Sequence, residues 1–490
     1  MNPTAGAGAP DSARPWPAFW VCVAVASITI LDLTKVNVAL PSIEHAFDVG
    51  STELQLVVSG YVLAFGLLLV PMGRIGDQRS RRRLFVIGLA LFTLASAVCG
   101  LAPSAEILLV GRLLQGVAAG IHMPQVMGLI QQLFPGGGRG RAFGLFGATI
   151  GIATAVGPLV GGLFIAIGGE ADGWRGIFWM NVPLCLTAIA FALRLLPSGS
   201  GERRRLELDG VGIALFGGAV LSLMLPFLLT TGSPDDSPAR WWWLAAFVAL
   251  MAALLLWERR YEARGRTPLL PMRLFAVPSF RNGALVGAAY FAGMPALFLL
   301  TTLFLQSGVR LSPLHAALVT IGFALSSAVA SWVGGRLVDR HGRILVVLGV
   351  SVMLVGIGAL VCAALFASAD HVGWIMAIIM VFSGLGGGLV ISPNQTLMYD
   401  EVPVRQAGLA GSVGQLGQRI GTAIGMAVAL SLFYATISGE RGDAAGIVVY
   451  HDAYAFGMLA VAACIAVALA AAVADLAHRR RAAADGPDEA

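Results

Sequence analysis

Fourteen apolar stretches run through this chain, and they constrain its fold more than any other feature of the sequence. A helix that crosses a bilayer needs about 20 consecutive, mostly apolar residues, and most of the stretches reach that length. The strict alternation of apolar and polar residues that marks membrane strands is absent from the sequence. The pattern therefore predicts an all-α integral membrane protein, with spans at residues 18–42, 54–73, 84–102, 106–134, 142–168, 177–196, 210–231, 242–257, 281–306, 313–335, 344–368, 373–398, 407–434 and 453–475.

Composition agrees with this class. Of the 490 residues, 57% are hydrophobic and 12% are charged, whereas about 25% are charged in an ordinary soluble domain. So few polar groups could not cover the surface of a soluble protein. The first 16 residues carry one arginine and the first apolar run is longer than a signal-peptide core, so we expect no cleavable leader.

Residue types and spacings argue against several chemistries. The five cysteines lie inside apolar runs without motif spacing, which predicts neither disulfides nor a metal site. The only lysine, Lys35, follows Thr34, and no lysine follows Gly136 to Gly138, so the P-loop that binds ATP is missing. The seven histidines show no metal-ligand or acid–base spacing. We therefore expect no cofactor, no ATP hydrolysis by a P-loop and no enzymatic activity.

Basic residues are distributed unevenly between the segments that connect the spans. If the N-terminus is cytoplasmic, 25 of the 32 basic residues fall in inner segments. The outer segments hold only Arg175, Arg240, Arg310 and Arg441. An excess of arginine on the cytoplasmic side is the rule for inner-membrane proteins, so we expect a multi-pass plasma-membrane protein with both termini in the cytoplasm. The basic isoelectric point is then a signal of topology, and nucleic acid is not an expected partner.

An internal repeat is visible. The segment from Gly73 through Asp77 to Arg81 recurs as Gly335, Asp339 and Arg343. Four glycines of the stretch 142–168 recur in the stretch 407–434, and the two sets are Gly144, Gly147, Gly157, Gly161 and Gly408, Gly411, Gly421, Gly425. Parallel repeats of this kind are typical of transporters whose substrate site lies between the repeats near the membrane midplane. We expect a six-helix bundle in residues 1–200, an inserted helix pair in 201–262, a second six-helix bundle in 263–476 and a cytoplasmic tail in 477–490.

Charged residues within the spans are few. Asp32 is the only acidic residue near the middle of a span, Lys35 follows on the same helix face, and Arg112 lies at a comparable depth. An unpaired charge inside a membrane is costly, so these three residues should form one cluster. Two interpretations stay open: a static ion pair with Lys35 extending to the outer surface, or a carboxylate that takes up and releases protons in a proton-coupled carrier.

Other polar side chains in the spans are candidates to line a substrate cavity, with structural packing as the alternative. They are Asn37, Gln115, His122, Gln415, Gln418 and Arg419. A lone histidine in an apolar helix is more often a satisfied core residue than a proton relay, which favours a structural role for His122.

Several motifs resemble those of one transporter family. They are Leu31-Asp32-x-Thr34-x-Val36-Asn37-Val38-Ala39-Leu40-Pro41, Gly73 to Arg82, Arg112-x-x-Gln115-Gly116, Gly147-x-x-x-Gly151 with Gly157-Pro158-x-x-Gly161-Gly162, Trp174-Arg175-x-Ile177-Phe178-x-x-Asn181-Val182-Pro183, and Pro268-Leu-Leu-Pro271. Through them, nearly the whole chain resembles the major facilitator superfamily and, within it, the 14-helix drug:proton antiporters (QacA/EmrB-like multidrug exporters). Lys35 departs from the family pattern, in which an apolar residue is usual, and Ser80 replaces a usual glycine.

The resemblance implies a major facilitator fold and export driven by the proton gradient, with Asp32 and Arg112 as the coupling pair and Lys35 beside them. Asp77 should lie near the cytoplasmic start of the stretch 407–434, where unpaired N–H groups favour an anion. Such a contact would hold the two bundles together on the inside, whereas solvated loop charges are the alternative. The candidate gating residues are Gly73, Asp77, Arg81, Arg82, Asp339, Arg343 and Arg405.

The glycines of the antiporter motif permit close helix packing, and Pro158 frees a backbone carbonyl and should bend its helix. Packing alone is an equal alternative to a role in transport. The motif residues are Gly151, Gly157, Pro158, Gly161 and Gly162.

The sequence thus favours a secondary transporter that exports amphipathic small molecules such as drugs in exchange for protons. A monomer is the expectation, although nothing in the sequence specifies the oligomeric state. Two alternatives stay open: an exporter dedicated to one endogenous metabolite, and a membrane sensor or scaffold, against which the Asp32 cluster counts. With Asp32 ionised, the charges of Asp32, Lys35, Arg112 and Arg419 total +2. We therefore expect neutral, zwitterionic or anionic amphiphiles as substrates, with Lys35 as their counter-charge.

Overall fold

The computed structural model describes residues 15–49, 51–134, 138–197, 209–228, 237–266, 268–440 and 447–484. The positions of Arg14, Arg203 to Arg205 and Arg441, which entered the topology argument, lie outside the described residues, as does the expected boundary at residue 200.

Within the described residues, 14 helices are long and apolar enough to cross a membrane, which confirms the predicted all-α class. The α-helices of the described residues, which include the four-residue α9 besides those that carry the spans, are α1 (Pro15–Phe47), α2 (Ser51–Gln78), α3 (Arg81–Leu101), α4 (Ala105–Leu133), α5 (Arg139–Trp179), α6 (Asn181–Leu195), α7 (Gly210–Leu228), α8 (Trp242–Ala263), α9 (Arg273–Ala276), α10 (Pro278–Leu303), α11 (Pro313–His341), α12 (Arg343–Phe366), α13 (Ala369–Met398), α14 (Ala407–Glu440) and α15 (Ile447–Ala484). Three short helical turns, η1 (Pro238–Trp241), η2 (Phe304–Gly308) and η3 (Val404–Gln406), join them.

One span is clearly longer than the sequence expectation, and another ends where it was expected to end. The stretch 242–257 is the apolar middle of a longer helical segment, Pro238–Ala263, whose ends carry tryptophan and arginine. The span expected to end at residue 168 does end there, because the helix that begins at Arg139 breaks at Gly169, whose φ of 77° only glycine adopts without strain, and the next span runs from Asp172 to Leu195. Polar and aromatic residues at the membrane interface continue a helix that a count of apolar residues ends too early.

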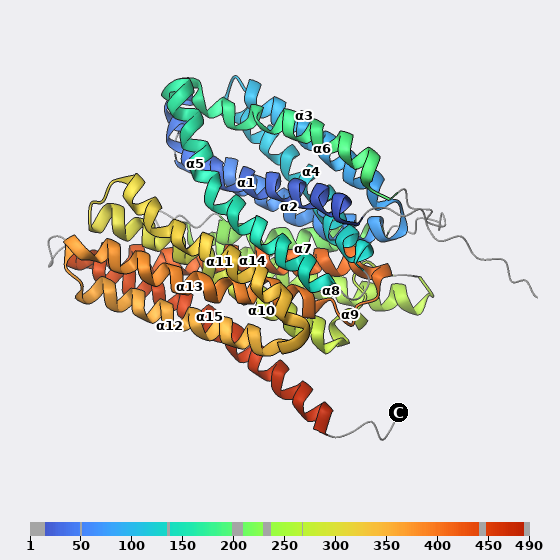
Figure 1. The fold of residues 1–490 in the computed structure, drawn as a ribbon. Coiled ribbons are helices and arrows are strands. Elements are labelled where there is room, and N and C mark those ends of the chain that lie inside the picture. The colour runs from blue at the N-terminus through green and yellow to red at the C-terminus, as the bar shows by residue number, and fades with distance from the viewer. Residues whose placement is uncertain are drawn as a thin grey trace, which may run out of the picture.

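The helices form two groups (Figure 1). The N-terminal group comprises α1 to α6, in which α1 packs on α5 and α2 on α4. The C-terminal group comprises α10 to α15, in which α11 packs on α13 and α10 on α14. Helices α7 and α8 pair with each other, and α7 lies against both α2 and α14.

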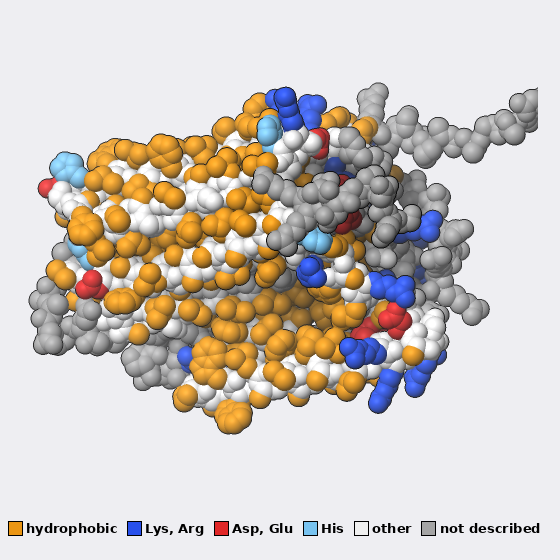
Figure 2. All heavy atoms as spheres, turned by 90° about the horizontal axis from the view of Figure 1, so that it is seen from below, with side chains coloured by type: hydrophobic (Ala, Val, Ile, Leu, Met, Phe, Trp, Pro, Cys, Tyr) orange, Lys and Arg blue, Asp and Glu red, His pale blue; other side chains and the backbone are white. Residues whose placement is uncertain are grey.

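The outer surface of the bundle is apolar. Figure 2 shows a broad band of hydrophobic side chains across one face, with most of its arginines gathered at one end. Large apolar side chains such as Phe366 and Trp374 are 82% and 77% exposed. A continuous exposed apolar band of this size marks a surface that lipid covers.

The two groups meet along the helix pairs α2–α14 and α5–α11. Where α5 crosses α11, Gly140 and Gly144 lie directly against the backbone of Gly335, and a Cβ on Gly140 would be 2.6 Å from the Gly335 oxygen. On the other side, contacts run from Asp77 with Gly408 to Phe65 with Arg419. We call the end of the molecule that carries Asp77, Gly140 and Gly335 the closed end.

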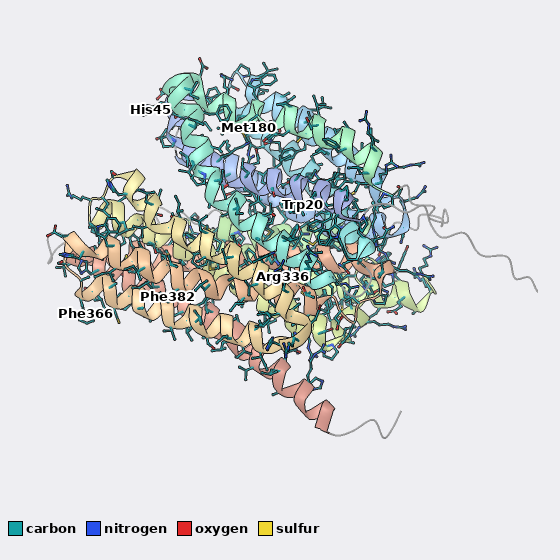
Figure 3. The ribbon with its side chains drawn as sticks, in the orientation of Figure 1. Trp20, His45, Met180, Arg336, Phe366 and Phe382 are labelled. Atoms are coloured by element: carbon teal, nitrogen blue, oxygen red, sulfur yellow. The ribbon has the colours of Figure 1, made fainter. Side chains whose placement is uncertain are left out.

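Away from the closed end the two groups diverge. Figures 1 and 3 show the separation widening toward the end that carries His45 and Phe366, whereas Arg336 lies where the groups converge. On the diverging part of α1, Asn37 and Val38 are exposed. The two groups are therefore joined near Asp77 and Gly335 and separate toward the opposite end, and we call the region between the separating parts the opening.

Candidate functional site

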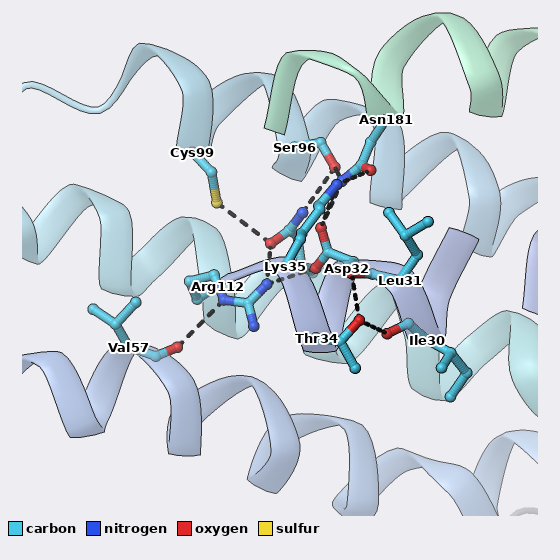
Figure 4. Close-up of polar contacts among 11 residues, drawn as sticks. Ile30, Leu31, Asp32, Thr34, Lys35, Val57, Ser96, Cys99, Arg112 and Asn181 are labelled. Carbon is cyan, nitrogen blue, oxygen red and sulfur yellow. Dashed lines mark hydrogen bonds and ion pairs between the residues drawn. The ribbon is translucent and has the colours of Figure 1, made fainter. Parts of the chain in front are cut away.

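Asp32, Lys35 and Arg112 lie together in the interior of the N-terminal group (Figure 4). The Asp32 Oδ2 atom is 2.7 Å from Arg112 Nη1, and its Oδ1 atom is 3.4 Å from Lys35 Nζ. All three side chains have an exposed fraction of 0%. Asp32 and Lys35 come from α1 and Arg112 comes from α4. The ion pair therefore joins α1, which packs on α5, to α4, which packs on α2.

Asn181 at the start of α6 completes the cluster. Its side-chain oxygen accepts a hydrogen bond of 2.6 Å from Lys35 Nζ, and its Nδ2 group donates one of 2.7 Å to Asp32 Oδ1. Lys35 therefore points into the bundle. The interpretation in which its stem carries the ammonium to the outer surface is wrong for this conformation, because the amide offers an acceptor inside the protein.

Neutral groups satisfy most of the remaining polar atoms. Gln115 accepts a hydrogen bond of 2.8 Å from Arg112 Nη1 and donates one of 2.8 Å to Ser96 Oγ. The Arg112 Nε group donates to the Val57 carbonyl at 3.3 Å, and the guanidinium carbon lies 4.3 Å from the centre of the Tyr61 ring. With one carboxylate and two cations, the enclosed cluster carries a net charge of +1 when all three groups are ionised.

Glycines of the antiporter motif hold α5 against α1 at the level of this cluster. A side chain at Gly157 would collide with Thr34, and a Cβ on Gly161 would lie 2.8 Å from the carbonyl oxygen of Lys35. Gly151 instead faces α11, and Gly162 has no neighbour within 4 Å. Helical backbone continues through Pro158, and the non-helical residue of α5 is Gly169.

Asp77 lies near the end of α2, at the closed end, where its side chain contacts the first turn of α14. Its Oδ1 atom accepts the N–H of Gly408 at 3.0 Å and its Oδ2 atom accepts the N–H of Leu409 at 2.8 Å. These are backbone donors that a helix leaves unsatisfied at its N-terminus, where the helix dipole also favours an anion. Gly73, one turn earlier, packs so closely on Ser412 and Gly408 that a side chain would not fit. We call the Asp77 contact with α14 the latch.

Arg81 reinforces the latch. Its Nη2 group donates to Asp77 Oδ1 at 2.8 Å and to the Val404 carbonyl at 2.9 Å, and its Nη1 group donates to the Gly128 carbonyl at 2.9 Å. Arg82 instead binds the Leu193 carbonyl within the N-terminal group.

The second repeat does not form a matching latch. Asp339 is exposed beside Gly140 and makes no hydrogen bond within the described residues. Arg343 pairs with Asp475 of α15, which also accepts a hydrogen bond of 2.9 Å from Asn282, so this arginine ties helices within the C-terminal group. Arg405 is exposed in η3. The residues predicted as gates thus divide into one inter-group contact around Asp77, one contact inside each group, made by Arg82 and Arg343, and the two exposed side chains Asp339 and Arg405.

The predicted cavity residues divide into two sets and Asn37, which is exposed on the diverging part of α1. Gln115 belongs to the ion cluster, and His122 is fully buried with its Nε2 atom 2.9 Å from Thr29 Oγ1, so neither reaches the opening between the groups. Gln415, Gln418 and Arg419 lie on α14, where Arg419 contacts Phe65 of α2 across the junction and Gln418 lies beside Gly287 of α10.

Sequence reasoning missed three residues of the site. Asn181 stands in a recognised motif but carries no charge that would mark it. Tyr61 and Phe65 are one turn apart on α2. The guanidinium of Arg112 lies over the Tyr61 ring, and that of Arg419 lies over the Phe65 ring. Among the described residues, no group of three or more His, Cys, Asp or Glu side chains could hold a metal ion.

Comparison with known proteins agrees with this architecture. The sequence model of the Major Facilitator Superfamily matches residues 22–426 and 283–487. The chain is 33% identical to the probable actinorhodin transporter of Streptomyces coelicolor over 89% of its own length and 75% of that protein. It is 32% identical to the methylenomycin A resistance protein of the same organism, with 88% of each chain covered.

Solved structures show the same fold at low sequence identity. The human organic anion transporter MFSD10 superposes with a TM-score of 0.65 at 13% identity, covering 93% of this chain and 99% of that one. The proton:xylose symporter XylE gives a TM-score of 0.61 at 16% identity, covering 92% and 95%. A multi-pass membrane fold of 14 spans, with the cluster of Asp32, Lys35 and Arg112 enclosed between helices, defines a secondary transporter and not an enzyme. The chain belongs to the Major Facilitator Superfamily.

Proposed function

We propose that this protein exports amphipathic small molecules, antibiotics among them, across the plasma membrane in exchange for protons. The observation that carries the proposal is the Asp32 carboxylate, which is fully buried within a span and lies between two cations. Ionisable groups at such positions are costly to maintain and mark proton and substrate pathways in transporters. Relatives named for actinorhodin transport and for tetracenomycin C resistance and export support outward transport of antibiotics.

The mechanism that fits this geometry is alternating access, in which the substrate site opens first to one side of the membrane and then to the other. The two six-helix units, in residues 1–200 and 263–476, move relative to each other, and the helix pair in 201–262 bridges them. The closed end faces the cytoplasm together with both chain termini, a direction supported by the 25 basic residues assigned to that side. One chain supplies both units and both helix pairs of the junction, so we propose a monomer as the functional unit.

Protonation couples to this movement through the cations beside Asp32. A proton on Asp32 removes the charge that Arg112 and Lys35 share, and the enclosed cluster then holds two cations without an anion. That arrangement is unfavourable in a low-dielectric interior, so the cations must find other partners or more solvent, which requires the helices to shift.

Everted membrane vesicles test the proposal. Wild-type vesicles should accumulate a fluorescent antibiotic when a pH gradient is applied, and Asp32→Asn should reduce accumulation to the level seen without a gradient. Asp172→Asn is the matched control, because Asp172 also pairs with an arginine but is 74% exposed. Full gradient-dependent accumulation by the Asp32→Asn variant would remove Asp32 from the coupling mechanism.

A further inference from the structure

Arg419 is a cation inside a span whose surroundings supply no anion. Its guanidinium carbon lies 5.0 Å from the centre of the Phe65 ring on α2. Within the described residues it makes no hydrogen bond or ion pair with another side chain or with the backbone. The fully or nearly fully buried cations Lys35, Arg112 and Arg343 each have a carboxylate partner, whereas Arg419 is partly exposed and has none.

Neighbouring amides on the same helix face are also without partners. Gln415 lies one turn before Arg419, is only 6% exposed, and both atoms of its amide group lack a hydrogen-bond partner. Gln418 lies beside Gly287 of α10 and is partly exposed. A buried amide with neither its donor nor its acceptor satisfied is rare in a native protein and costs free energy unless something else binds it.

The position of Arg419 places these groups at the base of the opening. Contacts between α2 and α14 start at Asp77 with Gly408, continue through Gly66 with Leu416, and reach Phe65 with Arg419. Further along α14, Gly421 and Gly425 pack on α10 within their own group. Because α14 begins at Ala407, Arg419 lies about 18 Å from the closed end, beyond the middle of a hydrocarbon layer of about 30 Å.

Lys35 does not fill this role in the structure. Its ammonium group has no exposed surface and donates to Asn181 while pairing with Asp32. The expectation that an anionic substrate meets a central cation therefore applies to Arg419, which is partly exposed and makes no hydrogen bond within the described residues.

We propose that Arg419 binds an anionic oxygen group, such as a carboxylate, on an amphipathic aromatic substrate, while Gln415 and Gln418 bind its other polar atoms and Phe65 packs on its ring. This inference rests on the proposed export function and names the substrate class. A guanidinium presents paired donors that match a carboxylate, and such charge-assisted hydrogen bonds are about twice as strong as neutral ones. The field of the nearby Asp32 cluster, with its net charge of +1, adds attraction for an anion.

Binding of a matched probe pair tests the inference without a proton gradient. The probes are 7-diethylaminocoumarin-3-carboxylate and its uncharged primary carboxamide, titrated onto the purified protein in lipid nanodiscs at neutral pH. Wild type should bind the carboxylate more tightly than the amide. Arg419→Gln should weaken carboxylate binding about 10- to 100-fold and leave amide binding unchanged, and Arg419→Lys should fall between.

Arg336→Gln is the matched control. Arg336 also lies over an aromatic ring, 3.9 Å from the centre of Trp332, but it is exposed at the closed end, so both probes should bind this variant as they bind wild type. Unchanged amide binding by Arg419→Gln shows that this variant is folded.

Equal wild-type affinity for the two probes, or carboxylate binding that survives Arg419→Gln, would overturn the inference. A third probe, the cationic 3-aminomethyl analogue of the same coumarin, tests the remaining outcome: if Arg419→Gln changes only the binding of this cation, Arg419 merely repels cations and the inference is wrong. The export proposal is judged separately, by gradient-driven accumulation in vesicles, so binding that depends on Arg419 in a protein that does not transport would count against export alone.

Discussion

Asn181 connects the two charges that α1 contributes to the ion cluster. Its side chain accepts a hydrogen bond from Lys35 and donates one to Asp32. One amide therefore provides hydrogen bonds to an ammonium and a carboxylate that are both shielded from solvent. Buried ion pairs stabilise a protein only when further hydrogen bonds satisfy their remaining donors and acceptors. The cluster therefore depends on a neutral side chain as much as on its charges.

Replacing Asn181 should expose that dependence. Asn181→Leu keeps a similar volume but leaves Lys35 and Asp32 each short of one partner, which should cost about 1–3 kcal/mol of stability. Thermal unfolding of the purified protein measures the loss, and gradient-driven export should fall with it. Asn37→Leu changes an exposed asparagine of α1 and should stay within about 0.5 kcal/mol of wild type. Equal unfolding of the two variants would mean that the amide bonds contribute nothing.

Charge is what made part of this site predictable from sequence. Asp32 and Arg112 stand out because a charge within an apolar stretch is costly and must find a partner. Asn181 and Tyr61 do not stand out, since a single amide or phenol is tolerated in many membrane helices. Asn181, the hydrogen-bond acceptor of Lys35, is 146 residues away in sequence, and only the packing of α6 on α1 and α3 brings the two residues together.

Among the helices, α5 has contacts on two sides that link the ion cluster to the junction of the groups. Gly161 faces the Lys35 carbonyl on α1, while Gly140 and Gly144 face Gly335 on α11. A helix that packs backbone to backbone on both neighbours cannot move against one without affecting the other. The glycines of the antiporter motif thus place the cluster in mechanical contact with the junction.

Enlarging Gly161 tests this contact. Gly161→Leu would force α5 away from α1 at Lys35, with an expected loss of about 1–3 kcal/mol in stability and a reduced rate of export. Gly162→Leu adds the same side chain at the next residue, where nothing lies within 4 Å, and should be tolerated. Thermal unfolding and vesicle accumulation of both variants give the comparison. Similar losses at the two positions would point to a general intolerance of leucine in this helix.

The latch on α14 offers a second test at this scale. Asp77→Asn removes a charge that accepts two backbone N–H groups and pairs with Arg81, so the closed end should open more often. A cysteine at Leu416, which is buried at the junction, should react faster with a maleimide added from the cytoplasmic side. Asp339→Asn should leave that rate unchanged because Asp339 makes no hydrogen bond in the described structure. Identical labelling in both variants would mean that the contact of Asp77 with α14 does not keep the closed end shut.

The repeat itself could be predicted from sequence, but its asymmetry could not. Asp77 and Asp339 occupy equivalent motifs and both lie beside the first turn of a helix, yet within the described residues only Asp77 accepts backbone N–H groups there. Sequence similarity between two segments does not say what each one packs against. The spans were predictable for a simpler reason, since their apolar length alone determines them.

At the scale of the whole molecule, the conformation is closed at the end that carries most arginines and diverges at the other. Both helix pairs of the junction are tight near Asp77 and Gly335, and the separation grows toward His45 and Phe366. With the closed end facing the cytoplasm, as we propose, this is the arrangement expected after a substrate has been delivered outward and before the carrier returns.

Side-specific labelling tests the orientation. Single cysteines at Ser237 and Arg405, both exposed, lie in segments assigned to opposite sides of the membrane. In a background without the native cysteines, an impermeant maleimide added to whole cells should label Ser237→Cys, and Arg405→Cys should react only in everted vesicles. Labelling of Arg405→Cys in intact cells would invert the assigned topology.

The only lysine of this chain is also one of its most deeply enclosed side chains. Apart from a free N-terminus, no other amine competes for an amine-specific reagent, so the wild-type protein carries a built-in reporter at its ion cluster. Carbamylation of Lys35 by cyanate, followed by mass spectrometry, would count how often the interior of the N-terminal group becomes wet. A rate that rises when the pH gradient is imposed would record the opening of the cluster during turnover, without any engineered label.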